Sequence, residues 1–238
     1  IIFDWIAFDA DDTLWKNEEL YRKGRETFAK MMAKYGVDHS IEHRVDELET
    51  DNIRYYGYGV MSFVLSLIEM GIKETEGELQ TGDVQRLLDL SKEMLTAEVV
   101  LMPGVEKVIK QVRKLAPLML ITKGDLLHQE RKVAESGLAG YFRAVEVVSD
   151  KSPEVYAAIL TKYQIQPERF LMVGNSLRSD VIPVLKIGGW AVHLADHLTW
   201  SHEDGGLEGQ NQERFLEVAS IQEVGRILED LAADKPDR

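Results

Sequence analysis

The feature that most constrains the fold is a short apolar run near the N-terminus that ends in a cluster of acids. Residues 5–15 have the sequence WIAFDADDTLW, so a stretch typical of a buried strand stops at Asp9 and is followed by Asp11 and Asp12. Side chains two residues apart in a strand point the same way, so Asp9 and Asp11 are expected to face one spot and Asp12 to face away. Two carboxylates that face each other require a shared proton or a cation between them. Because open parallel sheets bind ligands beyond the carboxyl ends of their strands, the run predicts a divalent-metal site at such an edge.

After about residue 100, short apolar runs alternate with helical segments. Strands are expected at 117–122, 144–148, 170–173 and 190–194, and helices at 105–115, 124–136, 152–163, 177–187 and 221–231. This alternation predicts an α/β fold, a Rossmann-like parallel sheet covered by helices on both faces.

The stretch 16–100 is helical throughout. Its apolar spacing and glycines predict helices at 17–35, 40–56, 61–70 and 83–95, the third of them ending before Gly71. We therefore expect an α/β core domain made of 1–15 and 101–238, with a helical domain, 16–100, inserted after the first strand. An insertion beside a strand-end site is well placed to act as a cap.

Composition limits the partners and the compartment. The 238 residues carry a net charge of -13, which argues against a nucleic acid or an anionic membrane held by bulk electrostatics. There is no cysteine, so thiol chemistry and disulfides are excluded. No run of about 18 apolar residues and no signal peptide is found, so we expect a cytoplasmic protein without a membrane partner. The chain opens directly in a strand, and its start is expected a few residues upstream.

Polar residues follow four of the predicted strands, and a parallel sheet would bring all four ends to one edge. They are Asp9 and Asp11 after the first strand, Thr122, Lys123 and Gly124 at the second, Lys151 after the third, and Asn175 to Asp180 after the fourth. Each group taken alone has a plainer explanation. The acids could form a solvated turn, Thr122 could cap a helix, and Lys151 could lie on the surface.

The full set resembles the haloacid dehalogenase superfamily. Its four motifs are matched in order by Asp9-Ala-Asp11-Asp12-Thr13, Thr122, Lys151 and the loop Asn175–Asp180, over residues 1 to about 200. The helical insertion after the first motif is similar to the cap of the family's phosphatases and 2-haloacid dehalogenases. The resemblance implies a hydrolase of the phosphatase-like branch, acting on a small phosphorylated molecule.

The resemblance also implies a role for each matching residue. Asp9 would be the nucleophile that forms an aspartyl-phosphate, and Asp11 would serve as general acid and then general base. Lys151 would neutralise the phosphate and orient Asp9. Thr122 would hold phosphoryl oxygens together with the amides that follow it, those of Lys123 and Gly124. Mg²⁺, with Mn²⁺ as the alternative, would bind Asp9, the backbone carbonyl of Asp11, Asn175 and Asp180.

Two positions depart from the family pattern. Asn175 stands where the fourth motif usually has its first acid, so the predicted metal site has one negative charge fewer, although an amide oxygen still ligates hard cations. Lys123 adds a positive charge beside the predicted phosphate site, where it could bind substrate or face solvent.

Several alternatives stay open. A 2-haloacid dehalogenase needs no acid at the position of Asp11 because a halide leaves without a proton, whereas a phosphomutase would use the same residues as a phosphatase. A weakly catalytic binding or regulatory protein is supported only by Asn175. The predicted cap carries aromatic residues that could recognise substrate or pack helices, and the substrate and oligomeric state are not indicated. These aromatic residues are Tyr55, Tyr56 and Tyr58.

The histidines near the C-terminal end of the predicted sheet lack the spacing of a helical zinc motif. His193, His197 and His202 are therefore expected to be loop or core residues, and 202–211 is expected to be a loop.

Overall fold

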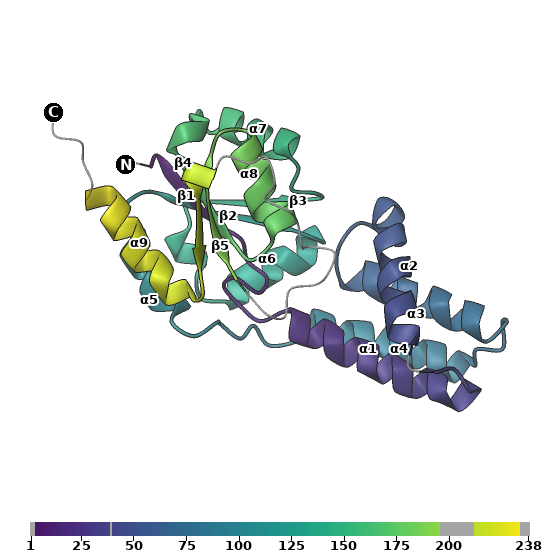
Figure 1. Cartoon of the computed structure of the whole chain (residues 1–238). Helices are drawn as coiled ribbons and strands as arrows, with labels where there is room; N and C mark the ends of the chain where they lie inside the picture. Colours follow the sequence, from purple (N-terminus) through teal and green to yellow (C-terminus); the bar gives the residue numbers. More distant parts are fainter. Residues whose placement is uncertain (1–2, 39, 196–211, 234–238) are drawn as a thin grey trace. The chain divides into compact units, whose positions relative to one another are not determined.

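The computed structural model describes residues 3–38, 40–195 and 212–233, which form two compact units (Figure 1). The α/β unit comprises the described residues of 1–16 and 99–238, and the helical unit is Asn17–Glu98. Each unit encloses its own cluster of buried apolar side chains, so each is described by itself.

The α/β unit is built on a six-stranded parallel sheet with the order β3-β2-β1-β4-β5-β6. The strands are β1 (Trp5–Phe8), β2 (Leu118–Lys123), β3 (Ala144–Val148), β4 (Phe170–Gly174), β5 (Trp190–Leu194) and β6 (Phe215–Val218). The chain leaves β1 toward β2 on one side and later returns to place β4 on the other. The strand order therefore reverses between β1 and β4, and the crevice beyond their carboxyl ends is where such sheets bind ligands.

Helices cover both faces of this sheet. They are α5 (Val105–Val112), α6 (Leu126–Glu135), α7 (Pro153–Lys162), α8 (Ile182–Lys186) and α9 (Ile221–Ala233). Alternate residues of β1 face opposite sides, so Ile6 and Phe8 pack with α5, α6 and α9 while Ala7 packs with α7 and α8. The sheet is thus the middle of three layers, as in an α/β fold (Figure 1).

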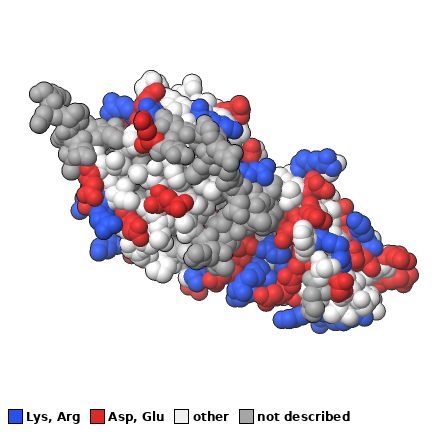
Figure 2. All heavy atoms as spheres, viewed as in Figure 1, with Lys and Arg blue, Asp and Glu red and all other residues white. Residues whose placement is uncertain are grey.

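The helical unit packs four helices around a second core. They are α1 (Glu18–Met32, continued by the 3-10 turn Ala33–Tyr35), α2 (Ile41–Tyr56), α3 (Val60–Glu74) and α4 (Thr81–Leu95). Its core contains the fully buried Phe63, and the partly buried Tyr21 packs edge-on against that ring at a centroid distance of 5.0 Å. Basic and acidic side chains are interspersed over the face of this unit that Figure 2 shows.

The predicted fold class is confirmed by this sheet, but one strand was missed and two predicted helices have other bounds. Strand β6 was not predicted. The third helix runs through Gly71 to Glu74, because Gly71 packs in the helix interior, where an added Cβ would lie 3.0 Å from Leu79. The helix predicted at 177–187 begins as a π-helical turn, η4 (Leu177–Val181), and becomes α8 only at Ile182, next to Pro183.

Two further findings concern the rest of the chain. The predicted loop 202–211, with His197 and His202, lies outside the described residues. Within the ranges that the structure describes, every helix is too short or too polar to cross a membrane.

Candidate active site

Asp9 extends the central strand β1 beyond its last residue into the crevice. Its amide donates to the carbonyl of Val173 at 2.8 Å, so the backbone is fixed between β1 and β4. Its side chain is 7% exposed and lies against Lys151, whose Nζ is 2.5 Å from Asp9 Oδ1 and 2.6 Å from Asp180 Oδ1. One buried lysine therefore joins the carboxylates that follow two different strands.

The charges of Asp9, Asp180 and Lys151 shift the pKa values of Asp9 and Lys151. Burial raises the pKa of Asp9 to about 7; Lys151 opposes that shift, and Asp180 adds to it. Burial also acts to lower the pKa of Lys151, but Asp180 and Asp9 hold that pKa well above its usual value. Once Asp9 is ionised, two carboxylates around one lysine leave a net negative charge in a buried place, and that charge favours a further cation.

The loop after β4 is shaped to bring Asp180 close to the sheet. Asp180 Oδ2 accepts a hydrogen bond from the amide of Ser176 at 3.1 Å, and the Ser176 hydroxyl accepts one from the amide of Ser179. Gly174 leaves the space that the carboxylate fills, because a Cβ there would lie well inside contact distance of Asp180. The last residue of β4 must therefore be glycine for Asp180 to reach Lys151.

Asn175 is held on both its side chain and its backbone. Its Oδ1 accepts from the Thr13 hydroxyl at 3.2 Å, which links the turn after β1 to the loop after β4. Its carbonyl oxygen lies 3.1 Å from Nε2 of His193, and Nδ1 of the same ring lies 3.0 Å from Glu217 Oε2. His193 is thus a buried histidine of β5 that supports this loop, in line with its predicted core role.

Asp11 does not share a cation with Asp9 but has its own lysine. Lys132 of α6 places Nζ 2.6 Å from Oδ1 and 2.8 Å from Oδ2 of Asp11. Trp15 Nε1 donates to Oδ1 at 2.7 Å and Gln129 Nε2 donates to Oδ2 at 3.0 Å. Burial acts to raise the pKa of Asp11, but Lys132, Gln129 and Trp15 together hold that pKa below its usual value.

The end of β2 carries the predicted phosphate-binding residues. Thr122 is buried, and Lys123 is half-buried with its Nζ 2.9 Å from the Ser179 hydroxyl, so Lys123 does not merely face solvent. The Gly124 amide donates to the Val148 carbonyl at 3.3 Å, which engages a donor that was predicted to hold phosphate.

The side chains at this edge fit a hard divalent cation. Asp9, Asp180 and Asn175 offer carboxylate and amide oxygens, the ligands that such ions prefer. Among the residues that the structure describes, no three His, Cys, Asp or Glu side chains form a metal-binding cluster. An ion here would therefore rely on two carboxylates and neutral oxygens, as the asparagine at position 175 implies.

Sequence reasoning missed the residues around Asp11. His128 and Gln129 form a polar buried face on α6 with Lys132, which follows them by four and three residues. Burial and the nearby Lys132 lower the pKa of His128 to about 4, so this ring is neutral. The polar spacing was a usable signal, but the sequence did not show which element this face would meet.

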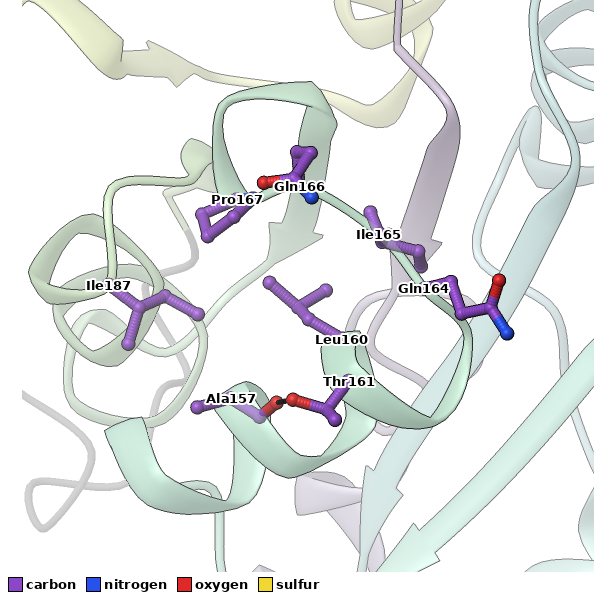
Figure 3. Close-up of a pocket in the computed structure, with 8 residues that line it drawn as sticks. All are labelled: Ala157, Leu160, Thr161, Gln164, Ile165, Gln166, Pro167 and Ile187. Carbon is purple, nitrogen blue, oxygen red and sulfur yellow. Dashed lines mark hydrogen bonds between the residues drawn. The ribbon is translucent and has the colours of Figure 1, made fainter.

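Two other features lie away from this group. A cavity of about 430 Å³ is lined mainly by apolar residues where the chain enters β4, at the opposite end of that strand from Asn175 (Figure 3). It contains no titratable side chain and is not a catalytic candidate. In the helical unit, Tyr55 and Tyr56 are 68% and 49% exposed, so they do not pack in its core.

Comparison with known proteins identifies the family. The model of the haloacid dehalogenase-like hydrolases matches residues 3–188. A haloacid dehalogenase-like hydrolase from Xanthomonas campestris is 35% identical, with a TM-score of 0.83 over 97% of this chain and 94% of its own. N-acylneuraminate-9-phosphatase of Rattus norvegicus is 24% identical over 95% of this chain and 94% of its own. Glyceraldehyde 3-phosphate phosphatase of Pyrococcus furiosus is 25% identical over 77% of both. The chain therefore belongs to the haloacid dehalogenase-like hydrolase family and is a hydrolase.

Proposed function

We propose that this protein is a divalent-metal-dependent phosphatase that hydrolyses a small phosphate monoester through an aspartyl-phosphate on Asp9. The observation that carries the proposal is the placement of two differently held carboxylates at the switch point of the sheet. Asp9 is buried against Lys151, and Asp11, two residues on, is bound by Lys132. Carboxylates in different environments suit different tasks, one as nucleophile and the other as proton carrier.

The reaction would proceed in two displacements. A carboxylate oxygen of Asp9 attacks phosphorus, a new O–P bond forms, and the bond from phosphorus to the alcohol oxygen breaks. Asp11 must first take up a proton against the low pKa that Lys132, Gln129 and Trp15 impose on it, and it then gives that proton to the departing alkoxide. Water then attacks the phosphorus of the aspartyl-phosphate while Asp11 takes the proton, which releases phosphate and restores Asp9.

The other residues stabilise charge. Lys151 holds Asp9 in place and offsets the phosphoryl charge, and Thr122 with Lys123 would contact phosphoryl oxygens at the end of β2. Asp9, Asp180, the Asn175 amide oxygen and the Asp11 carbonyl would hold a divalent ion. That ion would bring two anions together and offset the charge that develops on phosphate. We propose Mg²⁺, with Mn²⁺ as the alternative, since both favour oxygen ligands.

The residues favour a phosphatase, whose leaving group is an alkoxide, over a dehalogenase, whose leaving group is a halide ion. A halide leaves without a proton, and Asp11 with three donor side chains around it would then have no task. The named phosphatase relatives support a small phosphorylated metabolite as substrate. We also propose that the helical unit is a cap that selects this substrate, with the exposed Tyr55 and Tyr56 as part of its recognition surface. A cytoplasmic location stays a prediction.

The test is phosphate release from a panel of phosphorylated metabolites and 4-nitrophenyl phosphate, measured with Mg²⁺, with Mn²⁺ and with chelator. We expect metal-dependent release from a narrow group of metabolites. Transfer of phosphate between positions of one sugar, without release, would show a phosphomutase instead. Silence on the whole panel together with halide release from 2-haloacids would contradict the proposal.

A further inference from the structure

We infer that His193 is a positioning residue for the proposed metal ligand Asn175: together with Glu217 it fixes the Asn175 backbone, and with it the direction in which the side-chain oxygen faces an ion. The inference rests on the proposed function, in which Asn175 is one of the ligands of a divalent ion. It adds to that function two residues of β5 and β6, strands that supply none of the proposed catalytic residues or ligands.

His193 links two strands to the loop that follows β4. Its Nε2 lies 3.1 Å from the carbonyl oxygen of Asn175, and its Nδ1 lies 3.0 Å from Glu217 Oε2. A backbone carbonyl and an ionised carboxylate only accept hydrogen bonds, so we assign the ring as a donor from both nitrogens. The regular pairing of β4 with β5 ends at Gly174 and His193. A directional side-chain bond therefore holds the backbone of the next residue, Asn175.

The orientation of the His193 ring is set by β6. His193 and Glu217 are partners in the register of β5 with β6, so their side chains leave the sheet side by side on one face. Phe215 precedes Glu217 by two residues and lies on the same face, where its ring stacks on that of His193 at a centroid distance of 6.5 Å. The ring is buried, with His193 only 9% exposed. The bond to Asn175 is therefore made by a donor that is itself held in place.

Asn175 is also held through its side chain. Its Oδ1 accepts from the Thr13 hydroxyl at 3.2 Å, and an amide oxygen has a second lone pair that can ligate an ion. With the carbonyl bonded to His193 and Oδ1 bonded to Thr13, the residue has little freedom left at either end. An amide ligand needs this support more than a carboxylate does, because it lacks the net charge that attracts a cation from every direction.

The surroundings of His193 fit this task better than simple packing. Two residues earlier on the same face of β5, Ala191 packs in an apolar cluster with Val181 and Leu185. An apolar side chain at position 193 would extend that cluster without the desolvation cost of a histidine. The polar ring at the end of the strand is thus more readily explained by the bond that it makes to the loop.

The experiment measures Mn²⁺ binding to the substrate-free protein, from the electron paramagnetic resonance signal of the free ion. Two amide variants separate the two ring contacts: His193→Gln keeps an amide donor near the place of Nε2, and His193→Asn keeps one near the place of Nδ1. For His193→Asn, which leaves the Asn175 carbonyl without its donor, we expect the Mn²⁺ Kd to rise about ten-fold. For His193→Gln, which can restore that bond, we expect a rise of at most about three-fold.

A second variant perturbs the same pair from its exposed end. Glu217→Met removes the acceptor of Nδ1 at a side chain that is 58% exposed, and we expect Mn²⁺ binding about three-fold weaker than in wild type. The matched control is Glu146→Met on the opposite edge strand β3, where Glu146 accepts from Lys162 and Tyr163. Its Mn²⁺ Kd should stay within about two-fold of wild type.

An unchanged Mn²⁺ Kd in His193→Asn, or equal losses in His193→Asn and His193→Gln, would overturn the inference. Thermal melting checks the fold, and if the His193 variants do not fold, Glu217→Met decides, with an unchanged Kd as the contradicting result. Failure of the proposed function is distinguishable, because wild type would then bind Mn²⁺ but release no phosphate from any ester, and the effect on binding would still be measured. Wild type that binds no Mn²⁺ would overturn the inference and the proposed metal dependence together.

Discussion

The two units of the chain differ in how closely their buried acids are paired with basic side chains. In the α/β unit the buried carboxylates have dedicated lysines at 2.5–2.8 Å: Asp9 and Asp180 share Lys151, and Asp11 has Lys132. In the helical unit Arg25 pairs closely with Glu18 and lies farther from two more acids, 3.7 Å from Asp46 and 3.9 Å from Glu49. Four of the five buried polar atoms without a hydrogen bond among the described residues belong to this second unit.

The two units also differ in how many large apolar side chains they expose. Six of the ten large apolar side chains that are exposed among the described residues lie in the helical unit, which is about a third of the chain. They are Tyr55, Tyr56, Met61, Leu65, Ile72 and Leu88. A unit with unmatched buried polar groups and exposed apolar side chains suits contact with something else. The difference supports the proposal that reaction chemistry is built into the α/β unit and substrate selectivity into the helical one.

The largest effect should come from Asp9→Asn. The amide oxygen is a poor nucleophile, so we expect kcat to fall by about 10⁴-fold or more with the fold retained. The matched control is Asp4→Asn at the other end of β1, where Asp4 pairs with Arg169 at the surface. Phosphate release by Asp4→Asn should stay within about two-fold of wild type. An active Asp9→Asn would end the assignment of reaction chemistry to this strand end.

Gly174→Ala should come next. Its Cβ would displace the Asp180 carboxylate and break the contact with Lys151, so we expect about a 10²-fold loss of kcat and about 1–3 kcal/mol of destabilisation. Gly140→Ala is the control, because no atom lies within 4 Å of the Cβ it would add. Steady-state kinetics and urea denaturation measure both. A Gly174→Ala variant indistinguishable from Gly140→Ala would show that Asp180 does not need its position.

Asn175→Asp sharpens the account of the metal. The added carboxylate should lower the Mg²⁺ concentration for half-maximal rate by about ten-fold and change the rate at saturating metal much less. The Thr13 hydroxyl can still donate to the new side chain, so the loop should keep its shape. An unchanged Mg²⁺ titration curve would remove Asn175 from the ligand set.

The smallest effect concerns the helical unit and depends on pH. Burial raises the pKa of Glu49 to about 8, from an ordinary value near 4.5, so between these values the folded protein holds a proton that the unfolded chain releases. Stability must then fall as pH rises through this window, and Glu49→Gln removes that loss. Relative to wild type, Glu49→Gln should gain about 1–3 kcal/mol between pH 5 and pH 9.

Urea denaturation at pH 5, 7 and 9 measures this gain. Glu47→Gln is the control, since Glu47 is 70% exposed and lies 3.8 Å from the exposed ring of His43. It should show no pH-dependent difference from wild type. A Glu49→Gln variant with the same lack of pH dependence would mean that the buried acids of the helical unit are better matched than the distances indicate.

Sequence reasoning reached the sheet because its strands are apolar and flanked by turns. Five of the six strands were expected within about two residues of their bounds. Strand β6, Phe215–Val218, is as short as β1 but contains Glu217, so it lacks the unbroken apolar run that indicated β1. Gly71 was predicted to follow the end of the third helix, but it lies inside α3, where it packs against Leu79 and Phe28. Packing between elements is not visible in local sequence.

The residues of the candidate site also fall into those that could be predicted and those that could not. Residues at strand ends could be grouped in advance, because a parallel sheet brings such ends to one edge. Lys132 and Gln129 could not, since they lie within a helix whose rotation about its axis depends on the core that it covers. Pro183 was a missed local signal, because a proline inside a predicted helix indicates a boundary near it, and α8 begins just before this residue.

The most direct test of the central claim is to trap the covalent intermediate. Wild-type protein is mixed with Mg²⁺ and 4-nitrophenyl phosphate, quenched in acid within one turnover, digested and examined by mass spectrometry. The account predicts a phosphoryl group on the peptide that contains Asp9 and none on the same peptide of Asp9→Asn. Rapid phosphate release with no phosphorylated Asp9, or with the phosphoryl group on another residue, would contradict it.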